Sequence, residues 1–388
     1  MRILQILYYY DPYTSGLTVY ASRLANELAL RGHGITVLAS RHDRTLPMRE
    51  TTATGVHIRR IPVAMSLDRA VILPSLIPTA IGMMRDADVV HLHLPMAETA
   101  ALVAIGRILG KRIIVTHHAD LVLEGNRLSQ LAATVAKWSG IAGGKLANAF
   151  VTNTASRAQV SPMAKHMTGN LNIIPPPIVV APVTIRAGED FRRDFDLGSR
   201  PLIGYVGRYA SEKGIDVLLQ TIPAVQEHFP DARFALAGPR HDARDGSLLR
   251  GPWDPWLQRY AQAIRQLDYL SDDDLARFYA ACDVLVLPST DWTESFGMVQ
   301  IEAMMRGTPV VASDLPGVAD PIMKTGYGLL AKPGDVGDLA YAIIRVLTQP
   351  DTYLPDPNVV GSHYSLNATV DAYEGVYRGD AISRDVQP

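Results

Sequence analysis

The sequence has few of the residues that build cross-links or membrane spans. Cys282 is the only cysteine among 388 residues, which excludes internal disulfides and a cysteine-based metal cluster. Two apolar stretches, 71–84 and 131–146, are broken by proline, glycine or lysine and are too short to span a bilayer. The apolar run after Met1 stops at Asp11, too early for a signal peptide. We therefore expect a cytoplasmic protein in which Cys282 is a small core residue.

The chain also lacks a large excess of charge, because 37 Lys and Arg oppose 39 Asp and Glu. Up to Ile178, however, 18 Lys and Arg oppose 10 Asp and Glu, a balance of +8, whereas the rest has 19 against 29, a balance of −10. Nucleic-acid binding is disfavoured, since it is typical of clustered Lys and Arg with an extreme pI. The basic part either attracts an anionic surface or acceptor, or complements the acidic part across a cleft.

With 47% apolar and 20% charged residues, the chain is long enough for two globular domains with full cores. Strand-like and helix-like segments alternate in both halves, which predicts two doubly wound α/β domains with parallel sheets. In the first half we expect strands at 2–10, 34–39, 89–92, 112–116 and 149–153, and helices at 18–31 and 99–109. In the second half we expect strands at 202–207, 233–237, 283–289, 309–312 and 328–330, and helices at 215–227, 256–266 and 336–347.

A proline-rich segment separates the two halves. The run 174–178, Ile-Pro-Pro-Pro-Ile, cannot continue a helix or a central strand and predicts a stiff hinge. We expect one domain at 1–174 and a second at 179–364, with a closing helix at about 365–380 that packs back on the first. Ligands of open parallel sheets bind beyond the carboxyl ends of the strands, so two such sheets facing each other would form one deep cleft.

The strongest functional signal is the segment 293–304, which reads Thr-Glu-Ser-Phe-Gly-Met-Val-Gln-Ile-Glu-Ala-Met. It joins a strand to a helix whose first N–H groups are unpaired and attract a pyrophosphate. Glu302 falls about five residues into that helix, roughly 7 Å along its axis, where its carboxylate can accept from two ribose hydroxyls. Glu294 would face the sugar of the same ligand. Alternatively, Glu294 complements the helix dipole and Glu302 is solvated, but the apolar neighbours of Glu302 favour a buried carboxylate with a partner.

Other candidates follow predicted strands at their carboxyl ends. Arg208 and Lys213 stand five residues apart on one strand–helix loop and can clamp a diphosphate. His118, preceded by His117, is placed to bind a sugar hydroxyl or the reacting centre; a metal is disfavoured because no third ligand lies at a recognisable spacing. Gly16 follows the first strand and suits close approach of a phosphate or sugar, although any β–α turn favours such residues.

Two further clusters are interpreted as structural. His91 and His93 lie on one face of a strand end, and we expect core packing or support of the cleft from them. The three consecutive aspartates at 272–274 follow Ser271 and predict the start of a helix rather than a metal site.

In their order along nearly the whole chain, these motifs resemble the retaining glycosyltransferases of family 4, which share the two-domain GT-B fold. The motifs that carry the resemblance are Ser15-Gly16, Arg31-Gly32-His33, His118-Ala119-Asp120, Gly207-Arg208 through Lys213-Gly214, Glu294-Ser295-Phe296-Gly297 through Glu302, and 307–313. The chain departs from the family where Ser15 replaces the first of two glycines, and at 315–320, which reads Leu-Pro-Gly-Val-Ala-Asp where family members usually have glycine and glutamate.

The resemblance implies a hexosyltransferase-type enzyme that is retaining and metal-independent, takes a GDP or UDP sugar as donor and needs no cofactor. The residues it implies are His118, Arg208, Lys213 and Glu294 for catalysis, and Gly16, Ser295, Phe296, Gly297, Met298, Val299 and Glu302 for the donor. The acceptor would be a glycan or a lipid-linked molecule in cell-envelope polysaccharide or glycolipid synthesis, reached by peripheral attachment at the inner face of the membrane. No carboxylate is placed as a covalent nucleophile, so we expect attack on the face from which the leaving group departs.

The main alternative is a sugar-nucleotide epimerase or a phosphorylase-like enzyme on the same fold, since the cleft alone does not require a separate acceptor. A nicotinamide dehydrogenase is disfavoured because no Gly-x-Gly-x-x-Gly follows the first strand. A non-catalytic sugar-binding protein is disfavoured because the charged residues of the motifs are retained together.

Overall fold

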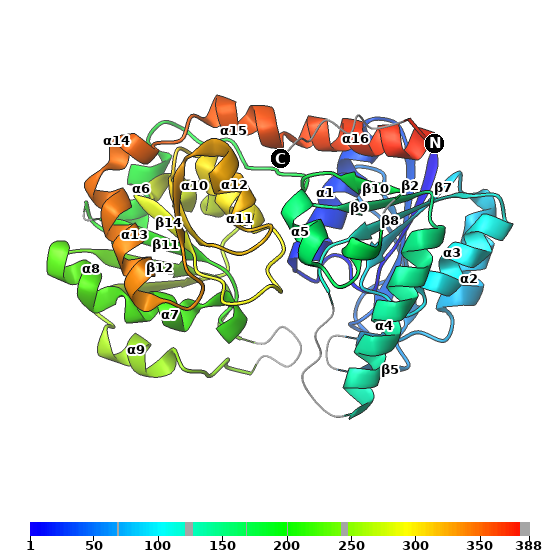
Figure 1. Ribbon diagram of the computed structural model, residues 1–388, viewed down its shortest axis with the longest axis horizontal. Coiled ribbons are helices and arrows are strands. Elements are labelled where there is room, and N and C mark those ends of the chain that lie inside the picture. Colours follow the sequence, from blue (N-terminus) through cyan, green and yellow to red (C-terminus); the bar gives the residue numbers. More distant parts are fainter. Residues whose placement is uncertain (68–69, 121–126, 168, 200, 242–246, 381–388) are drawn as a thin grey trace. The chain divides into compact units, whose positions relative to one another are not determined.

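The computed structural model describes residues 1–67, 70–120, 127–167, 169–199, 201–241 and 247–380. The chain forms two compact units, one comprising Met1–Pro177 with the segment from Leu366 onward and the other Ile178–Ser365 (Figure 1). The first boundary lies inside the proline-rich segment 174–178. Each unit contains one large sheet with helices on both faces, as the alternation of strand-like and helix-like segments predicts.

The sheet of the first unit has the strand order β10-β9-β8-β7-β1-β2-β4-β3, and only β3 runs antiparallel to its neighbour. Its strands are β1 (Arg2–Ile6), β2 (Gly34–Arg41), β3 (Arg49–Thr51), β4 (His57–Pro62), β7 (Val89–Leu94), β8 (Arg112–His117), β9 (Ala149–Thr152) and β10 (Leu171–Ile173), while β5 (Met65–Leu67) and β6 (Ala70–Ile72) form a separate hairpin. The helices are α1 (Gly16–Leu30), α2 (Leu76–Asp86), α3 (Thr99–Ile108), α4 (Arg127–Leu146), α5 (Ala155–Val160), the short η1 (Ala164–His166) and α16 (Leu366–Arg378).

Alternate residues of the central strands serve two separate cores. Leu4 and Leu92 pack with α2 and α3 on one face, whereas Ile3 and Val89 pack with α1 and α16 on the other. This division follows from the period of two along a strand. The C-terminal helix α16 is therefore part of the hydrophobic core of the first unit.

The second unit contains a wholly parallel sheet of order β13-β12-β11-β14-β15-β16. Its strands are β11 (Leu202–Val206), β12 (Arg233–Ala237), β13 (Ile264–Asp268), β14 (Val284–Leu287), β15 (Val310–Ser313) and β16 (Gly328–Ala331). Its helices are α6 (Ala187–Asp194), η2 (Ser211–Lys213), α7 (Ile215–Gln220), α8 (Ile222–His228), α9 (Asp254–Arg259), α10 (Asp272–Ala281), α11 (Met298–Met304), α12 (Asp320–Thr325), α13 (Val336–Thr348), α14 (Pro350–Tyr353) and α15 (Pro357–Tyr364).

Several local predictions are confirmed. Cys282 is buried in a core cluster of the second unit, and its thiol donates to the carbonyl of Phe278. The aspartates at 272–274 form the first turn of α10, with the Ser271 hydroxyl accepting from the N–H of Asp274. Among the residues that the structure describes, none of the helices combines the length and the hydropathy that a bilayer crossing needs.

The predicted helix over 256–266 is wrong. Helix α9 ends at Arg259, and Ile264–Asp268 is instead the edge strand β13, which pairs with β12. An edge strand has one hydrogen-bonded neighbour and exposes much of its surface, so its polar residues resemble those of an exposed helix. The pairing with β12 overrides that local pattern.

Candidate functional site

In the second unit, two loops leave the carboxyl ends of neighbouring strands. Strands β11 and β14 pair in parallel, so the loop from β11 to α7 and the loop from β14 to α11 emerge at the same edge of the sheet. The backbone N–H of Thr290 donates to the carbonyl of Glu212 over 3.1 Å, and its hydroxyl donates to the carbonyl of Ser211 over 3.0 Å. The two loops are thus joined before any ligand is considered.

Lys213 and Glu294 form an ion pair between these two loops. The Lys213 ammonium donates to the Glu294 carboxylate over 2.6 Å, and the two side chains are only 25% and 15% exposed. Partial removal from water strengthens such a pair relative to one on an open surface. The structure therefore brings together two of the predicted catalytic residues, although they lie 81 residues apart in the sequence.

Glycine is required where these loops turn. Gly214 has φ of +66°, and a Cβ there would lie 1.8 Å from the carbonyl oxygen of Pro288 on the other loop. Gly297 has φ of +74° and precedes α11, and its Cβ would lie 2.2 Å from a methyl group of Leu287. The loops can lie this close, and α11 can begin at this turn, because Gly214 and Gly297 have no side chain.

Arg208 lies on the same loop as Lys213 but pairs differently. Its guanidinium donates to the carboxylate of Glu212 over 2.9 Å, and nearly half of the side chain is exposed. The hydroxyl of Tyr205, a buried residue at the end of β11, donates to the Arg208 carbonyl over 2.8 Å. This bond fixes the backbone of Arg208 while its side chain extends toward solvent.

Glu302 is the fifth residue of α11 and is only 5% exposed. Its carboxylate accepts a hydrogen bond of 2.8 Å from the hydroxyl of Tyr279, which comes from α10. The expectation of a buried carboxylate with a partner is confirmed, and the partner is one that the sequence did not reveal. No spacing rule connects residues 279 and 302.

The remaining residues predicted for donor binding flank the start of α11. Phe296 is buried in the core, where its ring packs against that of Tyr364, so its side chain is not available to a ligand. Ser295, Met298 and Val299 are half-buried around the turn at Gly297.

In the first unit, His118 follows β8 and belongs to a stack of buried imidazoles. Its Nε2 lies 2.9 Å from Nδ1 of His93, and the ring of His93 lies 4.1 Å from that of His91. The edge of His118 also packs against Tyr20 of α1 at 4.6 Å between centroids. His91 and His93 are core residues, which confirms the interpretation of them as structural.

Hydrogen bonds connect this stack to helix α16. His91 contacts the Tyr377 hydroxyl at 2.9 Å and the Thr116 hydroxyl at 2.7 Å. The Tyr373 hydroxyl lies 2.9 Å from that of Thr116 and 2.6 Å from that of Tyr20. Nothing in the sequence predicts this network beyond two tyrosines four residues apart in the closing helix.

Burial makes these histidines neutral. Loss of hydration lowers the pKa of His91 to about 3, and it holds the pKa values of His93 and His118 well below 6.5, with neighbouring histidines adding to the effect. A neutral imidazole can donate or accept a hydrogen bond but carries no charge. His118 is thus suited to contact a sugar hydroxyl without placing a cation next to it.

Asp120, two residues beyond His118, is held inside the first unit. Its carboxylate accepts from Arg157 over 3.0 Å and from the Ser161 hydroxyl over 3.0 Å. Burial opposes ionisation, but contacts with His117, Arg157 and Ser161 outweigh it and lower the pKa of Asp120 below its usual value. Asp120 thereby anchors the chain just after His118.

Gly16 is the first residue of α1, behind a capping box in which Ser15 and Thr18 bond to each other's backbone N–H groups. A Cβ at Gly16 would meet nothing within 4 Å. The packing of the protein does not require glycine here, so the space beside Gly16 is open to a ligand. Among the described residues, no group of three or more His, Cys, Asp or Glu is arranged to hold a metal ion.

Comparison with protein families identifies both units. A family model described as glycosyltransferase family 4 matches residues 14–185, and one described as glycosyl transferases group 1 matches residues 200–349. The chain belongs to the family 4 glycosyltransferases.

Two relatives of this glycosyltransferase match over most of their length. A D-inositol 3-phosphate glycosyltransferase of Nocardiopsis dassonvillei is 25% identical over 395 residues, covering 95% of this chain and 90% of the relative. A phosphatidyl-myo-inositol mannosyltransferase of Mycobacterium leprae is 28% identical over 358 residues, covering 89% and 87%.

Solved structures establish the fold as GT-B. The sucrose-phosphate synthase of Thermosynechococcus elongatus matches with a TM-score of 0.74 at 21% identity, covering 97% of this chain and 98% of the other. The Anabaena protein HepE in complex with UDP-glucose matches with a TM-score of 0.73 at 17% identity, covering 97% and 99%.

The requirement for close approach of the loops can be tested at Gly214. Gly307 also has a positive φ, +80°, but a Cβ there meets nothing within 4 Å. We expect Gly307→Ala to cost about 1–2 kcal/mol from backbone strain alone. Gly214→Ala should destabilise the protein more than Gly307→Ala, because it adds a clash with the Pro288 backbone. The melting temperature of Gly214→Ala should therefore fall several-fold further than that of Gly307→Ala. Equal losses in the two variants would show that the loops need not lie so close.

The buried histidines predict a loss of stability in mild acid. The unfolded chain binds protons at these imidazoles below about pH 6.5 while the folded chain does not, so each contributes a loss of about 1.4 kcal/mol per pH unit. Urea unfolding should therefore show stability falling from about pH 6.5 toward pH 5. His93→Gln removes one of these imidazoles, so it should lower the slope of the unfolding free energy against pH by about 1.4 kcal/mol per pH unit. His57→Gln, at an exposed position of β4, should leave that slope unchanged. An unaltered slope in His93→Gln would contradict the neutral state of the stack.

Proposed function

We propose that this glycosyltransferase transfers a hexose from a UDP or GDP sugar to a glycan or lipid-linked acceptor, with retention of anomeric configuration and without a metal or other cofactor. The reaction would serve cell-envelope polysaccharide or glycolipid synthesis at the inner, cytoplasmic face of the membrane. The observation that carries the proposal is the Lys213–Glu294 pair, held at the carboxyl edge of the second sheet next to the start of α11.

This arrangement suits a nucleoside diphosphate. A phosphate that approaches the N–H groups at the start of α11 can take the Lys213 ammonium from Glu294, because it is also an anion and can accept from the same donor. Glu294 is then free to accept hydrogen bonds from hydroxyls of the sugar. Lys213 would stabilise the charge that grows on the diphosphate as its bond to the sugar breaks, and the exposed Arg208 can close on the same group.

The other residues fit the rest of the donor. Glu302, oriented by the Tyr279 hydroxyl, would accept from the ribose hydroxyls. Backbone groups of Phe296, Gly297 and Met298 would contact sugar and phosphate, since Phe296 directs its side chain into the core. His118, as a neutral imidazole, would contact the sugar near its anomeric carbon without repelling the oxocarbenium-like centre.

A UDP sugar is supported by one of the compared structures, a GDP sugar by the family resemblance alone, and an acceptor with a polar ring by the names of two relatives. HepE is described in complex with UDP-glucose, and the relatives are named for inositol phosphate and phosphatidylinositol acceptors. The net charge of +8 in the sequence up to Ile178 suits an acceptor of anionic character.

The nucleotide can be identified by thermal stability. We expect UDP or GDP to raise the melting temperature more than ADP, because a ligand that binds only the folded protein stabilises it in proportion to affinity and concentration. Glu302→Gln should reduce that increase, and Glu227→Gln, at an exposed position of α8, should not. A response to none of the three nucleotides would contradict the donor class.

Substitutions at Lys213 and Glu294 can separate an effect on nucleotide binding from an effect on sugar transfer. Glu294→Gln should preserve or tighten nucleoside diphosphate binding, because Lys213 loses its competing carboxylate, while kcat/KM for sugar transfer falls about 100-fold or more. Lys213→Ala should weaken the binding itself. Asp283→Asn serves as the control, since it breaks an ion pair with Arg192 at the opposite edge of the same sheet. Unchanged turnover in both site variants would rule out this active site, and an inverted linkage by NMR would rule out retention.

A further inference from the structure

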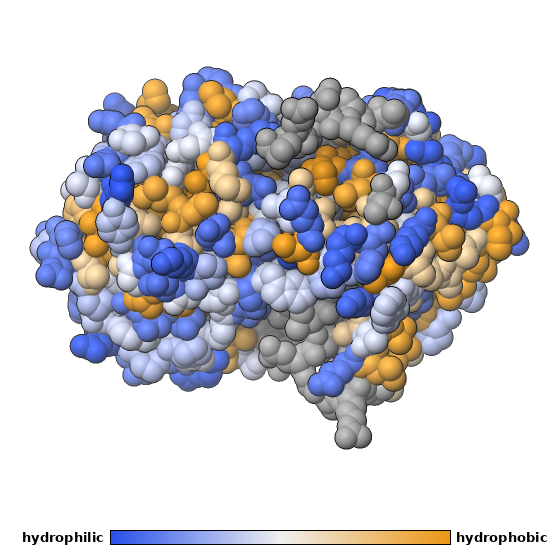
Figure 2. Space-filling view, viewed as in Figure 1, coloured by the Kyte–Doolittle hydropathy of each residue, from blue (hydrophilic) through white to orange (hydrophobic). Residues whose placement is uncertain are grey.

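Helix α4 exposes four large apolar side chains. Leu131, Val135, Trp138 and Leu146 are 59%, 47%, 61% and 54% exposed. The first three are spaced by four and three residues and therefore lie on one face of the helix. We call these four residues the α4 stripe. In the view of Figure 2, apolar side chains gather at the lower right, over the region where Figure 1 labels α4 and β5.

The buried face of α4 is built mainly from small residues, together with Ile141. A Cβ at Gly143 would lie 2.8 Å from a methyl group of Thr99, and one at Gly140 would lie 2.6 Å from the Met163 side chain. At Gly144 the added atom would meet Phe150 at 2.8 Å. The helix thus lies too close to its neighbours to bury a large side chain at these positions. Ile141 is the one large apolar side chain among the described residues of α4 that is buried, and the others lie on the outside.

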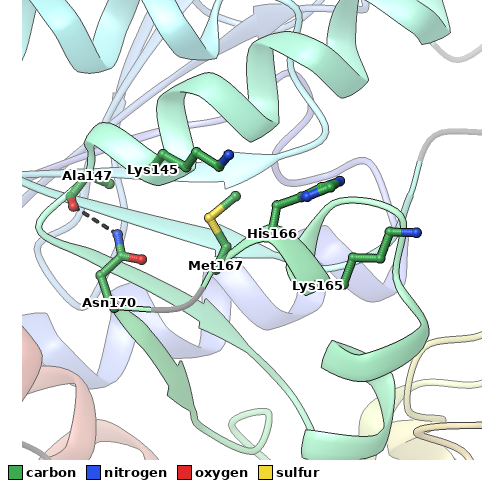
Figure 3. Close-up of a pocket in the computed structure, with 7 residues that line it drawn as sticks. Lys145, Ala147, Lys165, His166, Met167 and Asn170 are labelled. Atoms are coloured by element: carbon green, nitrogen blue, oxygen red, sulfur yellow. Dashed lines mark hydrogen bonds between the residues drawn. The ribbon is translucent and has the colours of Figure 1, made fainter.

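The surroundings of the stripe are positively charged. No Asp or Glu occurs in the sequence between Glu124 and Glu189. Lys137 and Lys145 are exposed on α4 itself. Lys145, Lys165 and His166 also line an open pocket of about 590 Å³ at the end of the helix. Figure 3 shows the amino group of Lys145 and the ring of His166 extending to the same side of this pocket.

We propose that α4 docks on the surface of an anionic lipid bilayer. The stripe enters the boundary between headgroups and acyl chains, with Trp138 at that level, while Lys137, Lys145 and Lys165 contact lipid phosphates. A second copy of the chain is a poorer occupant, because a symmetric contact through the stripe would bring the same lysines of both copies together. The inference deepens the proposed lipid-linked acceptor, and it rests on that proposal only for its biological purpose.

Trp138 provides a probe by difference, because the chain has four tryptophans and the Trp138→Ser variant gives the emission of the other three. Full-length protein is mixed with phosphatidylcholine vesicles that contain about one-third phosphatidylglycerol, or none, and binding is followed by co-sedimentation and tryptophan emission. We expect binding and a blue shift only with the anionic vesicles, both weakened by salt. The triple variant Leu131→Ser, Val135→Ser, Trp138→Ser should bind at least tenfold more weakly, and Lys137→Glu with Lys145→Glu should do the same.

Matched control variants distinguish binding through the α4 stripe from nonspecific hydrophobic or electrostatic binding to vesicles. Leu30→Ser removes an apolar side chain that is 68% exposed at the end of α1, and Arg44→Glu with Arg49→Glu reverses two exposed charges elsewhere in the first unit. Both controls should bind vesicles as the unaltered protein does. If the triple variant melts early, Trp138→Ser alone replaces it.

Three results would overturn the proposal. In the first, the unaltered protein does not bind anionic vesicles. In the second, the stripe variants bind these vesicles as strongly as the unaltered protein does. In the third, the protein is a dimer in vesicle-free solution and the stripe substitutions make it monomeric. No sugar donor is present in this assay. A protein that binds vesicles but does not respond to nucleotides would therefore refute the proposed function and leave the docking surface standing.

Discussion

The ion pair between Lys213 and Glu294 is the interaction on which the proposed donor site depends. It joins two loops that belong to different strand–helix units, and both side chains are largely shielded from water. An unpaired lysine at this place would repel its surroundings and favour many conformations, and an unpaired glutamate would repel a phosphate. The pair holds the two loops together without a ligand. A diphosphate could then replace the Glu294 carboxylate as the partner of Lys213 without having to order the loops first.

The first unit solves a different problem, which is the burial of many polar aromatic groups. Each imidazole or phenol removed from water needs a hydrogen-bonding partner. Here the partners come from β7, β8, α1 and α16, so that the ring of His118 is held by His93 and Tyr20, and the latter is held by Tyr373. The closing helix thus contributes to the orientation of His118 even though it follows the whole second unit in the sequence.

Much of this organisation could be predicted from sequence because it is local. Strand–loop–helix transitions, the turn at Gly297 and the depth of Glu302 along α11 all follow from residues within about ten positions of one another. The interactions that define the site are not local: the pairs Lys213–Glu294 and Tyr279–Glu302 span 81 and 23 residues and depend on which strands become neighbours. Strand β13 was missed for the same reason, since only its pairing with β12 distinguishes it from a polar helix.

The apolar composition of helix α4 does not reveal which of its side chains face outward. Its apolar stretch is too short for a membrane span, but a helix that does not cross a bilayer need not bury all its large side chains. The small residues carry the missing information. Gly143 and Gly144 follow Gly140 by three and four residues, which places all three on one side of the helix, and a face of glycines marks close packing against a neighbour. Once that face is assigned to the interior, Leu131, Val135 and Trp138 must point outward. Polar residues would satisfy water equally well at those positions, so a surface that is not always aqueous is the simplest reason for their presence.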